Sequence, residues 1–206
     1  PRYYYLAPTY SMAKRTSWDY LKEYTSVLPN VTYHETELRA DLPNGARIQL
    51  LGCERPDSLR GLYIDGVVLD EVAQMPPRLW TEIIRPALSD RNGFMIAIGT
   101  PQGHNSFHKL YDHALHQKDW YADIFKASET DIISELELNE AKALMPDEIY
   151  DSEFECSFDS AAIGSIYSKG LIKAEEENRI TKIPYELGIK VNTYWDLGMA
   201  DKTAIW

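Results

Sequence analysis

Two adjacent carboxylates, Asp70 and Glu71, follow three aliphatic residues in the stretch VVLDEVAQ, residues 67–74. A branched apolar run is typical of a strand buried on both faces, and the polar pair marks the point where that strand surfaces. One carboxylate at such a place can hold a divalent cation while its neighbour orients or activates a water molecule. Asp-Glu is also a frequent dipeptide, so an exposed acidic pair that only ends a strand is the alternative.

A second polar exit follows the stretch GFMIAI, at Gly99, Thr100 and Pro101. Gly99 permits a tight exit from a strand, and Thr100 offers a hydroxyl group to a ligand. In doubly wound sheets, ligands collect outside the carboxyl ends of parallel strands, so we expect the two exits to lie side by side. A simple strand-ending turn is the alternative for this segment.

The elements that must position these residues alternate between strand and helix, which favours a parallel sheet with helices on its faces. Strands are predicted over 2–8, 63–71 and 93–101, the last of them buried, and a further strand over 120–128. Helices are predicted over 9–28, 76–90 and 137–145. Residues 35–53 are predicted to form a hairpin whose turn is Pro43, Asn44 and Gly45. Residues 153–170 read as a connector, and a new strand begins within 191–206.

The net charge of −11 is concentrated in one part of the 206-residue chain. Residues 1–60 carry eight Lys and Arg against seven Asp and Glu, whereas residues 129–177 carry three against fourteen. We interpret the acidic segment as a solvated helical face, so the average charge does not exclude DNA as a partner elsewhere.

The chain shows no membrane-spanning apolar run and no signal-peptide features, and Cys53 and Cys156 have no metal-site spacing, which favours reduced thiols in the cytosol.

Residues 58–111 resemble the ATPase core of the large terminase subunits of tailed bacteriophages, the motors that package DNA. The matching features are the Leu-Arg-Gly step, the Walker B strand ending in Asp70 and Glu71, the IIRPAL helix and the IGTP.G coupling motif. Residues 3–21 look like the strand and helix that follow the phosphate-binding loop of that family. The stretch 147–170 is similar to its interdomain segment. The resemblance implies an α/β fold, a P-loop NTPase-like parallel sheet of the ASCE type with flanking helices.

The resemblance also implies roles for single residues. Asp70 would be the Walker B carboxylate on Mg²⁺, and Glu71 the catalytic glutamate that polarises water. Arg60 stands where the family carries an arginine proposed to reach the γ-phosphate of ATP in a neighbouring subunit, although an ordinary surface arginine is the alternative. Gly99 and Thr100 would form the coupling motif beside the nucleotide and relay the state of its γ-phosphate.

Residues 194–206 look like the first strand of an RNase H-like nuclease, which makes Asp196 a second candidate metal ligand. In that fold, carboxylates on different strands hold two Mg²⁺ or Mn²⁺ ions. Asp201 is interpreted as a turn-forming residue without a metal role. Thr9 is interpreted as a helix cap, the alternative being a contact with a phosphate or the DNA backbone.

One departure from the family pattern is that the 206 residues contain no Gly-Lys dipeptide and therefore no phosphate-binding loop. We interpret the chain as an internal piece that is inactive alone. It would comprise a partial ATPase domain at 1–155, a linker at 156–188 and the start of the nuclease at 189–206, so that the predicted fold is truncated before the phosphate-binding loop.

The implied partners are double-stranded DNA, the small terminase subunit, the portal protein and further copies in a homo-oligomeric ring, with no membrane, in the cytoplasm of the bacterial host. Two alternatives stay open. A helicase-type DNA translocase fragment would suit LDEVAQ and APT but should continue into a second motor domain. A non-catalytic interaction module would have lost its phosphate-binding loop by degeneration.

Overall fold

The computed structural model describes residues 1–159 without a gap and, beyond them, positions 170, 173–174, 177–181, 188, 195–196 and 204–205. The chain divides into two compact units, Pro1–Ser165 and Ile166–Trp206. The first unit contains the two strand exits and is described first.

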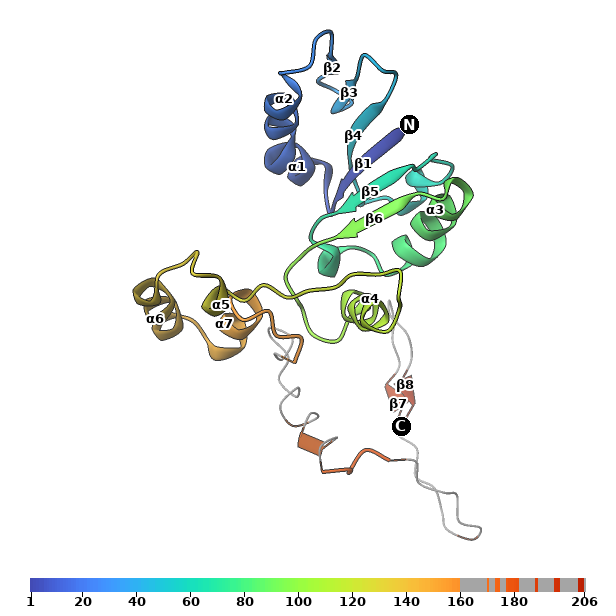
Figure 1. Cartoon of the computed structure of the whole chain (residues 1–206). Coiled ribbons are helices and arrows are strands. Elements are labelled where there is room, and N and C mark those ends of the chain that lie inside the picture. The colour runs from blue at the N-terminus through green and yellow to red at the C-terminus, as the bar shows by residue number, and fades with distance from the viewer. Residues whose placement is uncertain are drawn as a thin grey trace. The chain divides into compact units, whose positions relative to one another are not determined.

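A six-stranded sheet forms the centre of the first unit (Figure 1). In spatial order its strands are β2 (Thr32–His34), β3 (Arg39–Asp41), β4 (Arg47–Gly52), β1 (Arg2–Ala7), β5 (Gly66–Leu69) and β6 (Phe94–Ala97). Strands β4, β1, β5 and β6 are parallel, whereas β2 and β3 are antiparallel. The predicted α/β class is therefore confirmed, with a short antiparallel extension at one side.

Helical segments follow the parallel strands. The first stretch comprises α1 (Tyr10–Ala13), the π-helical η1 (Lys14–Trp18) and α2 (Asp19–Thr25), and a 3-10 turn η2 (Pro56–Leu59) follows β4. A 3-10 turn η3 (Val72–Gln74) follows β5 and precedes the π-helical η4 (Leu79–Ile84) and α3 (Arg85–Arg91). The later helices are α4 (Ser106–Leu115), α5 (Ala127–Thr130), α6 (Glu135–Leu144) and α7 (Asp147–Glu153).

The two faces of the sheet are covered by different helices, α1 and α2 on one side and α3 on the other (Figure 1). Side chains alternate between the faces along each strand, so Leu6 and Leu69 point to the α3 side. There they pack with Leu79, Ile83 and Ile84 in the larger apolar core. On the other side the smaller core consists of buried residues from β1, β4, the first helical stretch and the turn before β3: Ala7, Ala13, Trp18, Leu38 and Leu50.

The predicted hairpin is confirmed at β3 and β4. Gly45 adopts φ +80° in the connecting turn, and its N–H donates to Leu42 O at 2.9 Å. The N–H of Leu42 donates to Ala46 O at 2.8 Å, which closes the two strands. Glycine is favoured at Gly45 because left-handed backbone is costly for most other residues.

Strand β6 exists where it was predicted, but the prediction that it is buried is wrong. Phe94 is 55% exposed, Ile96 50% and Ile98, just beyond the strand, 47%. The physical reason is its position, because β6 is the edge of the sheet and none of the described helices covers this face. A run of apolar residues shows that a strand is hydrophobic, but it does not show whether another strand or helix covers it.

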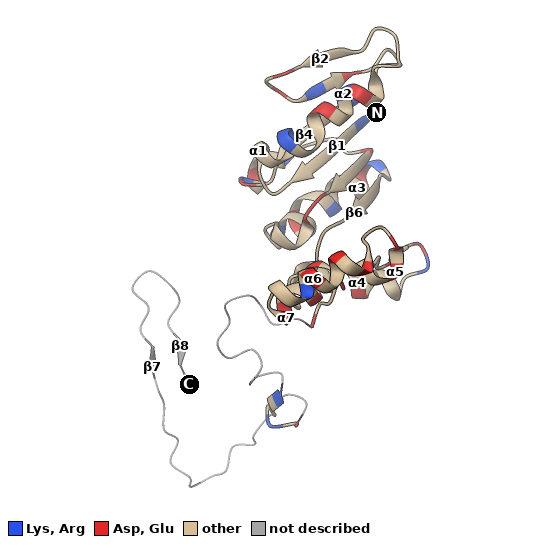
Figure 2. Ribbon diagram, turned by 90° about the vertical axis from the view of Figure 1, so that its left-hand side faces the viewer, with Lys and Arg blue, Asp and Glu red and all other residues tan. Residues whose placement is uncertain are grey.

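The strand predicted over 120–128 is also wrong. Residues 120–126 form no regular element, and α5 begins at Ala127. A stretch with strand propensity becomes a strand only where it pairs with another strand, and none of the described strands pairs with this stretch. Within its described residues up to 159 the acidic segment is mostly helical, as expected, and Figure 2 shows Asp and Glu positions in red along α6 and α7.

The second unit contains the short strands β7 (Trp195–Asp196) and β8 (Ala204–Ile205), which pair antiparallel. The strand predicted near the end of the sequence is thus present at Asp196, while Asp201 lies outside the described residues. None of the helices in the described part of the chain has the length and apolar composition needed to cross a membrane.

The two thiols are expected to differ in reactivity. Cys53 is buried, and burial raises its pKa to about 12. Cys156 is partly accessible, and partial burial followed by the charge of Glu155 raises the pKa of its thiol as well. The thiolate is the reactive form, so iodoacetamide at pH 8 should label Cys156 in the folded chain and leave Cys53 unmodified, as mass spectrometry of peptides would show. Urea should make both thiols reactive. Equal labelling of Cys53 and Cys156 in the folded chain would contradict the burial of Cys53.

Candidate functional site

The exits of β5 and β6 are joined by backbone hydrogen bonds. Ile98 N–H donates to Leu69 O at 2.9 Å, and Val72 N–H donates to Ile98 O at 3.2 Å. On the other side of β5, Asp70 N–H donates to Leu6 O at 2.9 Å. The expectation that Asp70 and Glu71 lie beside the segment that begins at Gly99 is therefore confirmed.

The Asp70 carboxylate is held from the neighbouring strand β1 by Tyr5, whose hydroxyl group donates to Oδ2. The Tyr5 hydroxyl also lies 3.3 Å from Thr16 Oγ1 on η1. Burial and the bond to Asp70 raise the pKa of Tyr5, so it stays a donor near neutral pH. A carboxylate offers about four lone-pair sites, so one bond from Tyr5 leaves acceptor capacity on Asp70.

Glu71 has a left-handed backbone, with φ 56° and ψ 48°. This conformation is costly for a residue with a side chain, and an outlier of this kind at a strand exit points to a functional constraint. Burial, followed by the negative charge of Asp70, raises the pKa of Glu71. The Gln74 side chain, whose Nε2 donates to Glu71 Oε2 at 3.4 Å, and the nearby Thr100 backbone N–H lower the pKa and oppose that rise.

Gly99 allows the two exits to approach each other closely. Its φ is 156°, and a Cβ atom there would lie 3.0 Å from Val72 N and 3.1 Å from Glu71 Cα. Asn105 fastens the far end of the same segment, because its Oδ1 accepts from the Phe107 N–H at 2.8 Å and caps α4. The sequence analysis missed Asn105 and α4, although an Asn before an amphipathic stretch is a recognisable start signal.

The donor set at this site fits a magnesium ion with few protein ligands. Asp70 and Glu71 bring two carboxylates to one strand exit, where burial and then the negative charge of Asp70 raise the pKa of Glu71. In the part of the chain that the structure describes, no three His, Cys, Asp or Glu side chains converge. Magnesium commonly takes one or two carboxylates and completes its shell with water and substrate phosphates, so Asp70 suits it.

Arg60 is not brought to the two carboxylates. It lies beyond η2, where Nε donates to Asp57 Oδ1 at 3.0 Å and Nη2 to Glu82 Oε2 at 2.9 Å. Its side chain is 49% exposed. Within the described residues, its hydrogen bonds and ion pairs go to these two acids and to the Glu82 carbonyl group. Any reach toward a phosphate must first break these contacts.

Thr9 is the N-cap of the first helical stretch, and its Oγ1 accepts from Met12 N–H at 3.1 Å. The N–H of Tyr10 donates to Glu54 Oε1 at 2.5 Å. An internal carboxylate therefore occupies the helix N-terminus where the alternative interpretation placed a phosphate. The interpretation of Thr9 as a cap is confirmed by this geometry.

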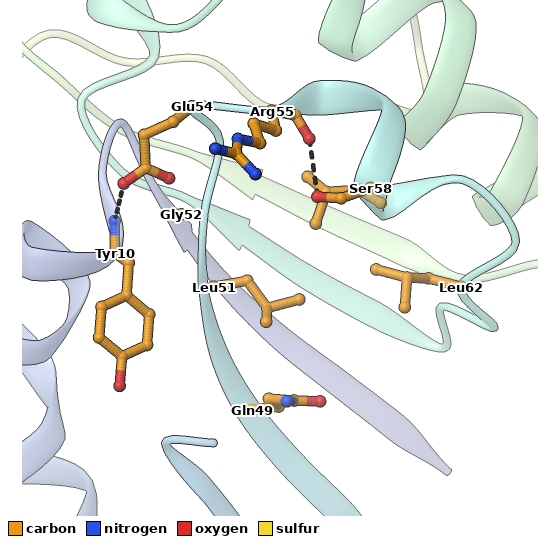
Figure 3. Close-up of a pocket in the computed structure, with 9 residues that line it drawn as sticks. Tyr10, Gln49, Leu51, Gly52, Glu54, Arg55, Ser58 and Leu62 are labelled. Atoms are coloured by element: carbon orange, nitrogen blue, oxygen red, sulfur yellow. Dashed lines mark hydrogen bonds between the residues drawn. The ribbon is translucent and has the colours of Figure 1, made fainter. Parts of the chain in front are cut away.

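A cleft of about 580 Å³ opens at the carboxyl end of β4 (Figure 3). It is lined by Tyr10, Gln49, Leu51, Gly52, Glu54, Arg55, Ser58, Leu59 and Leu62. None of these residues belongs to the exits of β5 or β6. We place the candidate chemistry at Asp70 and Glu71 in spite of the cleft, because the paired carboxylates and the strained backbone are there.

Comparison with known proteins gives similarity over part of the chain. No protein-family model matches. The large terminase subunits of Thermus phage G20c and Thermus virus P23-45 are each 47% identical over 58 residues, which is 28% of this chain. The matched stretch spans only 12% of the length of those relatives.

Solved structures match a larger part of the fold. The large terminase ATPase domain of Thermus phage P74-26 superposes with a TM-score of 0.66 at 23% identity, covering 76% of both chains. The large terminase of another thermophilic bacteriophage, in complex with ADP, gives a TM-score of 0.61 at 16% identity, covering 76% of this chain and 40% of that chain. The chain thus has the P-loop NTPase-like fold of large terminase ATPase domains, and its resemblance to large terminase subunits is confirmed.

Proposed function

We propose that the chain is part of a viral DNA-packaging motor and that Asp70 and Glu71 act on ATP. One observation carries the proposal: a partly buried Glu71 with a left-handed backbone stands beside Asp70 at a strand exit, packed against Gly99 of the neighbouring exit. One of the structural neighbours, the large terminase of a thermophilic bacteriophage, is known in complex with ADP and with ATP-gamma-S, which supports a nucleotide as the ligand.

Each residue has a role that follows from its position. Asp70, oriented by Tyr5, would hold Mg²⁺, which when bound neutralises charge on the β- and γ-phosphates. Glu71 would accept a hydrogen bond from the attacking water and draw off its proton. Gly99 and Thr100 would lie against the nucleotide, and the Thr100 N–H would interact with the charged Glu71 carboxylate. In an assembled ring, Arg60 would leave Asp57 and Glu82 to reach the γ-phosphate bound by a neighbouring subunit.

In this proposal another segment of a longer protein would supply the phosphate-binding loop, because these 206 residues contain no Gly-Lys dipeptide. The open edge of β6 and the exposed Phe94, Ile96 and Ile98 offer a place for a further strand and a covering helix. This chain covers only 76% of the P74-26 ATPase domain, which supports a missing portion of the same domain. The longer protein that contains both parts is called the parent here.

The second unit would begin a metal-dependent nuclease that cuts concatemeric DNA. Asp196 on β7 would supply one carboxylate to Mg²⁺ or Mn²⁺, with further ligands from later strands. The partners of the parent would be double-stranded DNA, the small terminase subunit, the portal protein and other copies of itself, in the cytoplasm of the bacterial host. The linker would lie between the two activities, at 156–188.

Replacing Asp70 tests the nucleotide site. In the parent, Asp70→Asn should lower ATP turnover at saturating Mg²⁺ by about 10²-fold or more, because a neutral amide holds the ion poorly. Phosphate release measured against Mg²⁺ concentration reports the change. Asp19→Asn, at a highly exposed carboxylate on α2, is the matched control and should leave the titration unchanged. An Asp70→Asn curve that overlays the wild type would refute the assignment. Mg²⁺-dependent turnover by the pure 206-residue chain would refute the separate prediction that this chain is inactive alone.

A further inference from the structure

The segment after β6, residues 98–105, is joined to α7 by a hydrogen bond. Ser152 Oγ donates to Pro101 O at 2.5 Å, and both residues are buried, with Ser152 only 5% exposed. Serine inside a helix commonly bonds to a carbonyl of its own preceding turn. Ser152 instead reaches a segment 51 residues earlier in the chain. Removal of its hydroxyl group would leave the Pro101 carbonyl buried without this donor, which carries a desolvation cost.

A second contact joins the same two parts of the chain, between residue 104 of the segment and residue 159 after α7. His104 Nε2 and Asp159 Oδ1 are 2.7 Å apart. Between α7 and Asp159, the Phe158 ring packs on three rings of α4, with centroid distances of 5.9 Å to Phe107, 5.0 Å to His108 and 5.4 Å to Tyr111. The residues that lead out of α7 are therefore fixed to the element that follows the 98–105 segment.

The other end of the segment touches the candidate site. Gly99 is packed against Glu71 Cα, and the nearby Thr100 N–H favours the charged form of the Glu71 carboxylate, which lowers its pKa. Pro101 is the next residue, so two residues, Thr100 and the ring-restricted Pro101, separate the Thr100 N–H from the carbonyl that Ser152 holds. We therefore expect a displacement of α7 to be transmitted to the Thr100 N–H beside Glu71.

We propose that Ser152 is a positioning residue for the Asp70 and Glu71 site, acting through Pro101 and Thr100, with Phe158 as the second anchor. The consequence is that the helix leading into the linker and the loop at the nucleotide site move as one. The effect on catalysis rests on the proposed function, whereas the mechanical link does not.

Amide hydrogen exchange on the 206-residue chain tests the link without a nucleotide. Ser152→Ala should speed exchange in peptides covering 98–105 by about fivefold to tenfold, the effect of losing one net hydrogen bond, while β1 and β5 keep their protection. Ser152→Thr, which retains the hydroxyl group, should restore slow exchange. Ser128→Ala is the matched control, because the exposed Ser128 donates its Oγ hydrogen to Glu155 Oε2 at 2.7 Å and not to the segment. Unchanged exchange at 98–105, or an equal rise across all strands, overturns the proposal.

Two further experiments distinguish a positioning role of Ser152 from a purely structural one. In the parent, Ser152→Ala should lower kcat for ATP severalfold at an unchanged KM, with recovery in Ser152→Thr. Faster exchange without any loss of kcat would overturn the role in positioning. If Ser152→Ala does not fold, Phe158→Ala should raise exchange at 98–108 alone, and protection equal to wild type there would count against the link. Failure of the proposed ATP site would appear separately, as full turnover in Glu71→Gln.

Discussion

Glu71→Gln in the parent is expected to abolish nearly all ATP turnover while nucleotide binding persists. Glutamine keeps the size of the side chain and can still hydrogen-bond to the Thr100 N–H, but it cannot take a proton from water. Positioned proton transfer contributes about 10²–10⁴-fold to rate, so kcat should fall within that range. Phosphate release would give kcat, and binding of a fluorescent ATP analogue should change by less than about threefold.

Glu54→Gln is the matched control for this experiment. The Glu54 carboxylate also accepts a backbone N–H at an exit on the same edge of the sheet, from Tyr10 at 2.5 Å. The two variants therefore make the same chemical change in the same kind of contact. If Glu54→Gln loses as much turnover as Glu71→Gln, the loss would reflect disturbance of this edge of the sheet and not catalysis by Glu71. Full turnover in Glu71→Gln would show that Glu71 is not catalytic.

Gly52→Ala is expected to destabilise the fold more than its single methyl group suggests. A Cβ atom at Gly52 would lie 2.8 Å from Thr9 C and closer still to Tyr10 N, which are backbone atoms and cannot rotate away. It would also clash with Glu54 Oε2, on the carboxylate that accepts the Tyr10 N–H in Figure 3. The β4 exit or the first helix must shift, so the free energy of unfolding should fall by roughly 1–3 kcal/mol.

Urea unfolding followed by circular dichroism measures this change. For a chain of this size the same loss should lower Tm by about 2–4 °C per kcal/mol. Gly170→Ala is the control, because Gly170 is exposed and a Cβ atom there would meet no atom within 4 Å. Both substitutions restrict the unfolded chain equally, so the comparison isolates the steric effect. Equal stability of the two variants would show that β4 and α1 do not approach as closely as described.

Local features of the sequence predicted local structure well. Pro43, Asn44 and Gly45 specified the turn between β3 and β4 because left-handed backbone at Gly45 is a property of that residue itself. The aliphatic run before Asp70 specified β5, and the parallel order of strands was enough to place Asp70 and Gly99 at one edge. These predictions needed only propensity, periodicity and the geometry of parallel sheets.

Contacts between distant segments could not be predicted in the same way. Tyr5 and Asp70 are 65 residues apart and Ser152 and Pro101 are 51 apart, and neither pair has a spacing signal. The exposure of Phe94 and Ile96 depends on the absence of a covering element among the described residues, which composition does not report. The roles of Arg60 and Asp196 came from the family resemblance alone, and both remain predictions.

The most direct test of the account is to measure ATP turnover and metal-dependent DNA cleavage side by side in the parent and in its Glu71→Ala and Asp196→Ala variants. The account predicts that Glu71→Ala loses turnover and keeps metal-dependent cutting, whereas Asp196→Ala loses cutting and keeps turnover. If both variants retain both activities, the carboxylates at the end of β5 and on β7 are structural, and the proposed motor and nuclease sites are contradicted.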